Sequence, residues 1–134
     1  MKREAFDQKL RDFQVIQFKL AEMYMKVETS RLLYLKAAWT ADTTPDATIP
    51  ASIAKAYATD AAMECASEAL QIHGGYGYID QYPVEKLFRD AKLYQIYEGT
   101  SEVQRMILGR FVLDGYKPAR ESMPRWTEQK APDF

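Results

Sequence analysis

The run of residues 7–39 contains neither proline nor glycine, and no other feature of the chain constrains its fold as strongly. Apolar side chains recur through it at spacings of three and four, which is the period of an amphipathic helix. The members of this stripe are Phe6, Leu10, Phe13, Ile16, Leu20, Tyr24 and Val27. The pattern predicts one long helix over residues 7–39, about 50 Å in length at ~1.5 Å per residue, with the stripe facing the core.

Two prolines and several turn residues interrupt the pattern over residues 43–50. A second helix, rich in alanine, is expected over residues 51–72. Its small side chains would let neighbouring helices approach closely. Gly74 and Gly75 end it, since glycine adopts the backbone conformations that a helix end often needs.

Residues 76–82 are expected to form a loop. Pro83 suits the first turn of a third helix, which the pattern continues to Tyr97. A fourth helix is predicted over residues 101–113, before Gly115 and Pro118.

These elements predict an all-α fold, an antiparallel up-and-down helical bundle, because the connections are short. No strand pattern or internal repeat competes with it. Residues 1–116 form the predicted domain, and residues 117–134, with three prolines among charged residues, are predicted to be a mobile tail.

Composition excludes several classes of function. The net charge of −1 gives no reason to expect nucleic acid or an acidic membrane as a partner. No apolar run is long enough to span a bilayer. One His cannot build a metal site alone. The lone Cys65 cannot form an internal disulfide, which fits a reducing compartment, and it is expected to be a buried small apolar side chain.

A carboxylate directly before a Gly-Thr-Ser break is the strongest candidate for chemistry. Glu98 precedes Gly99, a helix stop, and Thr100 or Ser101 can cap the next helix; Ser101 and Gln104 have the spacing of a capping box. A helix N-terminus favours anions, including phosphate groups. Taken alone, the pattern is also compatible with a helix-terminal Glu that faces water.

Three segments in this order resemble the C-terminal domain of acyl-CoA dehydrogenases, with the medium-chain type nearest. They are Gln71-Ile72-His73-Gly74-Gly75-Tyr76-Gly77-Tyr78, Tyr82-Pro83-Val84-Glu85-Lys86-Leu87-Phe88-Arg89-Asp90-Ala91 and Tyr97-Glu98-Gly99-Thr100. The resemblance runs from Arg3 to Leu113.

The resemblance implies an FAD-dependent oxidoreductase that converts an acyl-CoA thioester into a trans-2-enoyl-CoA. It identifies Glu98 as the base that removes the proton next to the thioester carbonyl. Desolvation by a bound acyl chain and flavin would raise the pKa of such a carboxylate and make it a better base. Gly99 would leave room for the substrate, and Tyr97 would line the acyl pocket.

The resemblance also implies contacts with FAD from three parts of the chain. The family pattern Arg-x-x-Phe-Gly is matched by Arg3 and Phe6, but Asp7 replaces the glycine, and a carboxylate there is unfavourable beside a pyrophosphate. The residues implied as FAD contacts are Arg3, Gln14, Gln71, Ile72, His73, Gly74, Gly75, Thr100, Ser101 and Glu102.

The family has further domains before this one, which supply most of the flavin site. The chain alone is therefore expected to be inactive, with a flavin-domain chain as a possible partner. A helix that precedes this segment in the family would cover one face of the long helix, so we expect a homo-oligomer, a dimer or a tetramer. The alternative is a non-catalytic helical scaffold. The expected location is the cytoplasm, or the mitochondrial matrix in a eukaryote.

Overall fold

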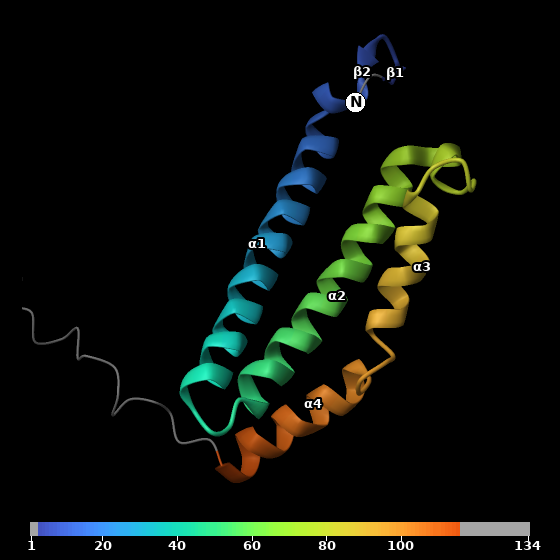
Figure 1. The fold of residues 1–134 in the computed structure, drawn as a ribbon. Helices are drawn as coiled ribbons and strands as arrows, with labels where there is room; N and C mark the ends of the chain where they lie inside the picture. Colours follow the sequence, from blue (N-terminus) through green and yellow to red (C-terminus); the bar gives the residue numbers. More distant parts are fainter. Residues whose placement is uncertain (1–2, 116–134) are drawn as a thin grey trace, which may run out of the picture.

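The computed structural model describes residues 3–115, and Figure 1 shows their arrangement. A short hairpin precedes a helical bundle. The elements are β1 (Glu4–Ala5), β2 (Gln8–Lys9), α1 (Gln14–Thr43), α2 (Thr48–His73), α3 (Val84–Tyr94) and α4 (Ser101–Arg110).

Helix α2 is the centre of the bundle. It packs against α1 on one side and against α3 and α4 on the other, so that α3 and α4 follow one another along it (Figure 1). The predicted all-α helical bundle is confirmed. Within residues 3–115 no helix combines the length and the hydropathy needed to cross a membrane. The predicted tail, residues 117–134, lies outside the described part of the chain.

The N-terminus differs from the prediction, because α1 begins at Gln14 and not at Asp7. Strands β1 and β2 pair antiparallel, which contradicts the expectation that the chain has no strands. The turn between them consists of Phe6 (φ 51°) and Asp7 (φ 60°). Two-residue hairpin turns favour positive φ, which aspartate tolerates better than most residues. The apolar spacing across Phe6 therefore did not indicate a helix.

The other helix ends were predicted to within a few residues. Helix α2 begins at Thr48, which places Pro50 in its first turn, where a proline is tolerated. It ends at His73, and its C-cap Gly74 has a φ of 60°, which suits a residue without Cβ. The prediction for α3 was too long, because the helix ends at Tyr94, and α4 gives way to a π-helical turn at Phe111–Gly115.

The core is shallow and lies along α2. Within residues 3–115 the buried apolar residues are Ala54, Ala56, Ala61, Ile72, Val84 and Ala91, four of them alanines. Helix α1 contains no buried residue. Small side chains allow the helix axes to approach closely, but each of them buries little apolar area.

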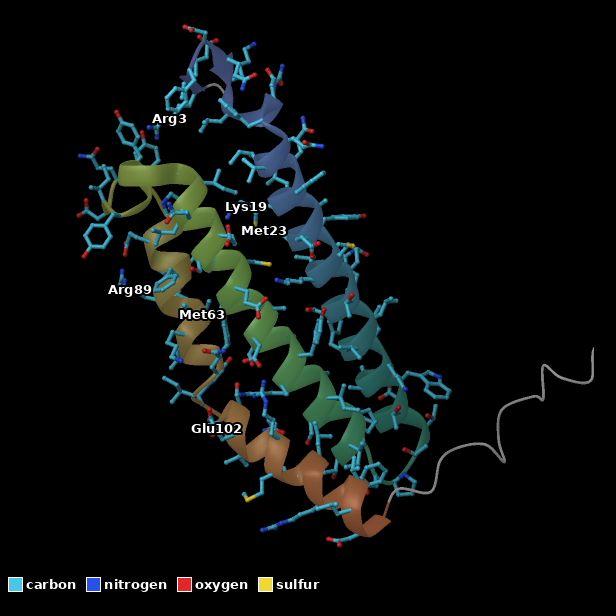
Figure 2. The ribbon with its side chains drawn as sticks, turned by 180° about the vertical axis from the view of Figure 1, so that it is seen from behind. Arg3, Lys19, Met23, Met63, Arg89 and Glu102 are labelled. Atoms are coloured by element: carbon cyan, nitrogen blue, oxygen red, sulfur yellow. The ribbon has the colours of Figure 1, made fainter. Side chains whose placement is uncertain are left out.

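The predicted core stripe of α1 is partly wrong. Leu20, Tyr24 and Val27 are 40, 66 and 48% exposed. The face toward α2 instead carries Lys19 and Lys26, which form ion pairs with Glu68 and Glu64 of α2. Figure 2 shows Lys19 and Met23 between the two helices. Lysine stems cover apolar surface while their ammonium groups reach the carboxylates, so charged residues occupy positions that the apolar count assigned to the outside.

A second row of apolar side chains on α1 faces solvent. Phe18, Met25, Leu32 and Trp39 are seven residues apart and 62, 53, 68 and 65% exposed. A spacing of seven is close to two helical turns, so the four side chains follow one side of the helix. We call them the heptad stripe.

Gly77, in the turn after α2, and Gly109, in α4, provide a test of how tightly the backbone is packed at the two places. A Cβ on Gly77 would lie 2.5 Å from the backbone oxygen of Leu70, whereas a Cβ on Gly109 would meet no atom within 4 Å. Gly77→Ala should therefore cost about 1–3 kcal/mol through overpacking. Gly109→Ala should stabilise α4 by up to about 1 kcal/mol, because alanine favours a helix. Urea unfolding followed by circular dichroism measures both, and changes of the same sign would contradict this packing.

Candidate functional site

Residues 95–101, here called the Glu98 corner, connect α3 to α4. The corner is closed at its base by a hydrogen bond of 3.0 Å from the Ser101 amide to the Gln95 carbonyl oxygen. At its tip, Glu98 has a φ of 52° and Gly99 a φ of 88°. Positive φ costs a residue with a Cβ about 1–2 kcal/mol, so Glu98 is held in a conformation that it would not choose alone.

Two side chains of α4 and its cap support the tip. Thr100 is the N-cap, and its Oγ1 accepts a hydrogen bond of 3.3 Å from the amide of Val103. The buried side chain of Gln104 donates from Nε2 to the carbonyl oxygens of Gly99 (3.3 Å) and Glu98 (3.5 Å). The predicted capping box of Ser101 and Gln104 is therefore wrong, because Thr100 makes the cap and Gln104 binds the corner instead.

The side chain of Glu98 is exposed, as the simpler interpretation of the sequence expects. Tyr97 beside it is 43% exposed, and its ring centroid lies 5.4 Å from that of Tyr94. Both rings are open to solvent in the described chain, so Tyr97 is accessible beside Glu98, where it was expected to line the acyl pocket. Glu98 and Tyr97 thus present a carboxylate and an aromatic ring on an accessible surface.

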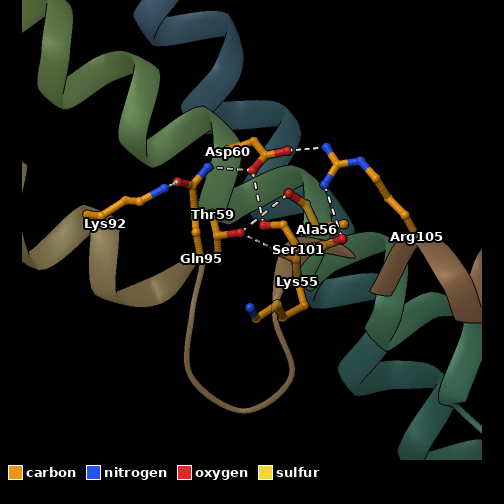
Figure 3. A network of polar contacts seen from close by, with 8 residues as sticks. All are labelled: Lys55, Ala56, Thr59, Asp60, Lys92, Gln95, Ser101 and Arg105. Atoms are coloured by element: carbon orange, nitrogen blue, oxygen red, sulfur yellow. Dashed lines mark hydrogen bonds and ion pairs between the residues drawn. The ribbon is translucent and has the colours of Figure 1, made fainter. Parts of the chain in front are cut away.

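The base of the corner is tied to α2 by Asp60 (Figure 3). Its Oδ1 accepts hydrogen bonds from Gln95 Nε2 at 2.6 Å and from Ser101 Oγ at 3.2 Å. Its Oδ2 forms an ion pair with Arg105 of α4. Partial burial by itself would raise the pKa of Asp60, but the hydrogen bonds from Arg105 and Gln95 outweigh it and lower that pKa. The carboxylate is therefore ionised at neutral pH.

A hollow of about 420 Å³ lies beside this network, between α2 and the start of α4. Asp60, Thr100, Ser101 and Glu102 line it. Hydrogen bonding to its own backbone and to the Thr100 hydroxyl lowers the pKa of Glu102. Thr100 and Glu102 can reach a ligand here, whereas the hydroxyl of Ser101 is buried and already bound to Asp60.

One lysine near the corner is unusual. The Nζ of Lys55 is buried and has no hydrogen-bond partner among the described residues. Figure 3 shows the side chain close to the Glu98 corner, on the same side as Ser101. A buried donor without an acceptor costs about 1–3 kcal/mol, so this end of α2 holds polar groups at a cost in stability.

A second group of predicted residues meets at the C-terminal end of α2. Arg3 donates a hydrogen bond of 3.0 Å from Nη1 to the carbonyl oxygen of His73, and its guanidinium lies 5.5 Å from the ring centroid of Tyr76. A Cβ on Gly74 would be 3.3 Å from Arg3 Nη1. We call Arg3, His73, Gly74 and Tyr76 the Arg3 cluster.

The other residues predicted to bind a cofactor lie around this cluster or apart from it. Gln71 is exposed on the last turn of α2, and a Cβ on Gly75 would meet no atom within 4 Å. Ile72 is buried, so only its backbone can reach a ligand. Gln14 is exposed at the first residue of α1.

The two groups lie far apart within one chain. Asp60 at the base of the Glu98 corner and His73 in the Arg3 cluster are both on α2, about 20 Å apart along its axis at ~1.5 Å per residue. The residues that the family resemblance implied thus fall into two separate groups. No group of three or more His, Cys, Asp or Glu residues in the described chain could hold a metal ion.

Comparison with known proteins identifies the family to which the chain belongs. The profile of the family described as acyl-CoA dehydrogenase, C-terminal domain, matches residues 1–113. A probable acyl-CoA dehydrogenase of Bacillus subtilis, YngJ, is 47% identical over 111 residues, which are 83% of this chain and 29% of that protein. The short-chain-specific acyl-CoA dehydrogenase of Megasphaera elsdenii is 50% identical over the same shares of the two chains.

Solved structures give the same result. Butyryl-CoA dehydrogenase from Megasphaera elsdenii superposes with a TM-score of 0.79 at 49% identity, over 83% of this chain and 29% of that one. Glutaryl-coenzyme A dehydrogenase superposes with a TM-score of 0.78 at 36% identity, over 83% and 28%.

These matches define an all-α domain with the architecture of the C-terminal domain of acyl-CoA dehydrogenases. The chain belongs to the acyl-CoA dehydrogenase family, and it corresponds to that family's C-terminal domain. It spans about 29% of the length of the curated relatives that it matches.

Sequence reasoning missed the residues that hold the corner. Asp60, Gln95 and Arg105 were not singled out, and Gln104 was given a different partner. A signal was present in α2, where Asp60, Glu64 and Glu68 are four residues apart in an otherwise alanine-rich helix and so lie along one face.

The strain at Glu98 can be measured. Glu98→Gly removes the Cβ that disfavours a φ of 52°, and even after the greater freedom of glycine in the unfolded chain it should raise stability by about 0.5–1 kcal/mol. Glu98→Gln keeps the Cβ and should leave stability within about 0.5 kcal/mol of the parent. Urea unfolding of the three proteins compares them; an unfolding free energy for Glu98→Gly no higher than for Glu98→Gln would show that the corner stores no strain.

Proposed function

We propose that this chain supplies the general base and part of the FAD site of an enzyme that dehydrogenates acyl-CoA thioesters. The observation that carries the proposal is Glu98. Its carboxylate is exposed at a strained tip, while both ends of the corner that bears it are tied to other elements. Backbone strain of this kind is found where a side chain must be held in a set position for its function.

The chemistry follows from the position of the carboxylate. Glu98 would remove the proton from the carbon next to the thioester carbonyl, and the backbone at Glu98 would help to polarise that carbonyl. Tyr97 offers an aromatic wall for the acyl chain, and Gly99 leaves space beside the carboxylate. FAD, when bound, supplies the acceptor for the hydride.

The Arg3 cluster suits the phosphates of FAD. Arginine carries five N–H donors, and the described contacts of Arg3 use one of them, on the His73 carbonyl oxygen. The open space beside Gly75 would let a ligand approach the backbone. Gln71 and His73 would add polar contacts there, Ile72 its backbone, and Gln14 is a further ligand candidate on α1.

The residues after Glu98 would serve the cofactor differently. Thr100 and Glu102 line a hollow at the N-terminal end of α4, where backbone amides favour anions. Ser101 would contribute through its backbone, because its hydroxyl is bound to Asp60. Since the two sites are about 20 Å apart along α2, we infer that they serve different parts of the cofactor or cofactors of neighbouring subunits.

Turnover would need protein segments beyond this one, because the chain spans about 29% of its relatives. We assign the chain to the cytoplasm, or to the mitochondrial matrix in a eukaryote. Cys65 is a free cysteine, which suits a reducing compartment. It is half-buried, and burial raises the pKa of its thiol.

Complementation tests the assignment of the base. The chain would be mixed with FAD and with the part of Megasphaera elsdenii butyryl-CoA dehydrogenase that precedes the matched region. Reduction of a dye by butyryl-CoA is then measured, together with bound flavin. We expect turnover with the parent chain and a loss of at least about a hundredfold with Glu98→Gln, with flavin retained.

Glu22→Gln is the matched control, because Glu22 is an exposed carboxylate on α1 away from both sites. Equal turnover with Glu98→Gln and with Glu22→Gln would assign the base elsewhere. A parent complex that binds neither FAD nor substrate would favour the scaffold function instead.

The heptad stripe supports the proposal of a homo-oligomer and is also what a scaffold would use. Four large apolar side chains along one side of a helix form a patch that soluble proteins usually cover. We infer that α1 of a second copy packs there, in a dimer or a tetramer.

Light scattering coupled to size exclusion tests this inference with two variants. Leu32→Glu places a charge in the heptad stripe and should yield monomers, because a carboxylate is costly to bury. Leu87→Glu makes the same exchange on α3, at a leucine that is 57% exposed, and should leave the assembly unchanged. A monomeric parent chain, or equal effects of the two variants, would contradict self-association through α1.

A further inference from the structure

The Glu98 corner is fastened at its base and open at its tip. Gln95 precedes Glu98 by three residues, Ser101 follows it by three, and the side chains of both donate to the same oxygen, Asp60 Oδ1. The backbone hydrogen bond from Ser101 to Gln95 joins the two ends directly. One carboxylate on the central helix thus holds both ends of the segment that bears Glu98.

The surrounding side chains fix the orientation of this carboxylate. Arg105 forms an ion pair with Asp60 Oδ2 and donates from Nη1 to the carbonyl oxygen of Ser101 at 3.1 Å. Lys92 donates to Gln95 Oε1 at 3.0 Å, which turns the amide nitrogen of Gln95 toward Asp60. Charge-assisted hydrogen bonds of this kind are roughly twice as strong as neutral ones.

Asp60 borders the hollow beside the corner, but in the described chain both of its carboxylate oxygens are already bound within the protein. Its hydrogen-bond partners are the two ends of the corner and the first turns of α4. The tip itself is supported separately by Gln104, which binds the carbonyl oxygens of Glu98 and Gly99. Asp60 therefore determines where the corner sits on the bundle, and Gln104 determines the shape of its tip.

We propose that Asp60 is a positioning residue for Glu98: it fixes the two ends of the Glu98 corner to α2 and so sets the place of the carboxylate relative to the rest of the bundle. The proposal rests on the proposed function only in its catalytic consequence. The clamp itself is a property of the chain alone. A base displaced by about 1 Å can lose about a hundredfold in rate, so such a clamp would matter for catalysis.

Hydrogen exchange measures the clamp without any activity. The Ser101 amide bonds to the Gln95 carbonyl oxygen at the base of the corner, so its exchange reports opening there. Asp60→Asn keeps the shape of the side chain and removes its charge, and we expect exchange of this amide to rise about tenfold or more. Asp42→Asn is the same substitution at an exposed position near the end of α1 and should leave hydrogen exchange of the Ser101 amide unchanged.

Two further variants keep the test valid if Asp60→Asn unfolds. Gln95→Met and Ser101→Ala each remove one hydrogen bond to Asp60 and leave its ion pair with Arg105 in place. Each should raise exchange of the Ser101 amide by less than Asp60→Asn does. Glu98→Gln should leave it unchanged, since the base of the corner does not involve that carboxylate. Exchange in Asp60→Asn equal to that in Asp42→Asn would overturn the proposal.

The complemented enzyme provides the kinetic readout. Asp60→Asn should lower kcat about tenfold or more with little change in KM, because it misplaces a base and removes no substrate contact. Asp60→Glu retains the charge and should restore part of the loss. A rise in KM of about tenfold with kcat unchanged would show that Asp60 supports substrate binding and does not position the base. If the parent complex does not turn over, the proposed function fails while the exchange result still decides the clamp.

Discussion

Packing against one alanine-rich helix is the constraint on which the rest of the structure depends. Helix α2 is the common neighbour of α1, α3 and α4, and in the described part of the chain four of the six buried apolar residues are alanines. Small side chains bring the helices close but bury little apolar area. Carboxylates on α2 therefore determine much of how the helices align with one another. Asp60 binds Arg105 of α4, and Glu64 and Glu68 bind Lys26 and Lys19 of α1. Apolar contacts alone would leave the register between these helices weakly defined.

The same helix explains why the predicted functional residues fall into two groups. The Glu98 corner is attached near the middle of α2, and the Arg3 cluster is assembled where α2 ends at His73. A straight helix keeps these places about 20 Å apart, whatever the neighbouring loops do. The chain thus acts as a rigid spacer between a carboxylate and a cationic cluster. Any larger assembly that uses both must have dimensions that match this spacing.

The sequence was informative where local chemistry decides the structure. Glycine at position 74, proline at position 83 and the Gly-Thr-Ser break after Glu98 located the helix ends to within a few residues, because these residues act on their own backbone. The packing face of α1 could not be found in this way. Lys19 and Lys26 lie on it only because Glu68 and Glu64 face them, and such pairs across helices leave no periodic signal. The hairpin before α1 and the clamp at Asp60 were missed for the same reason: each depends on partners distant in sequence or on a turn geometry that an apolar count ignores.

The separation between a fastened base and an open tip has a consequence for how this corner can change over generations. The side chains of Gln95, Thr100 and Gln104 hold the corner, and residue 98 contributes only its backbone carbonyl oxygen to these contacts. The side chain of residue 98 takes no part in them. Substitutions of Glu98 should leave the fold intact. Because the backbone at this residue is strained, a glycine there should even stabilise the fold. Selection can therefore replace the side chain at residue 98 while the scaffold stays intact. A corner of this design allows a lineage to lose or alter its chemistry without first losing its structure.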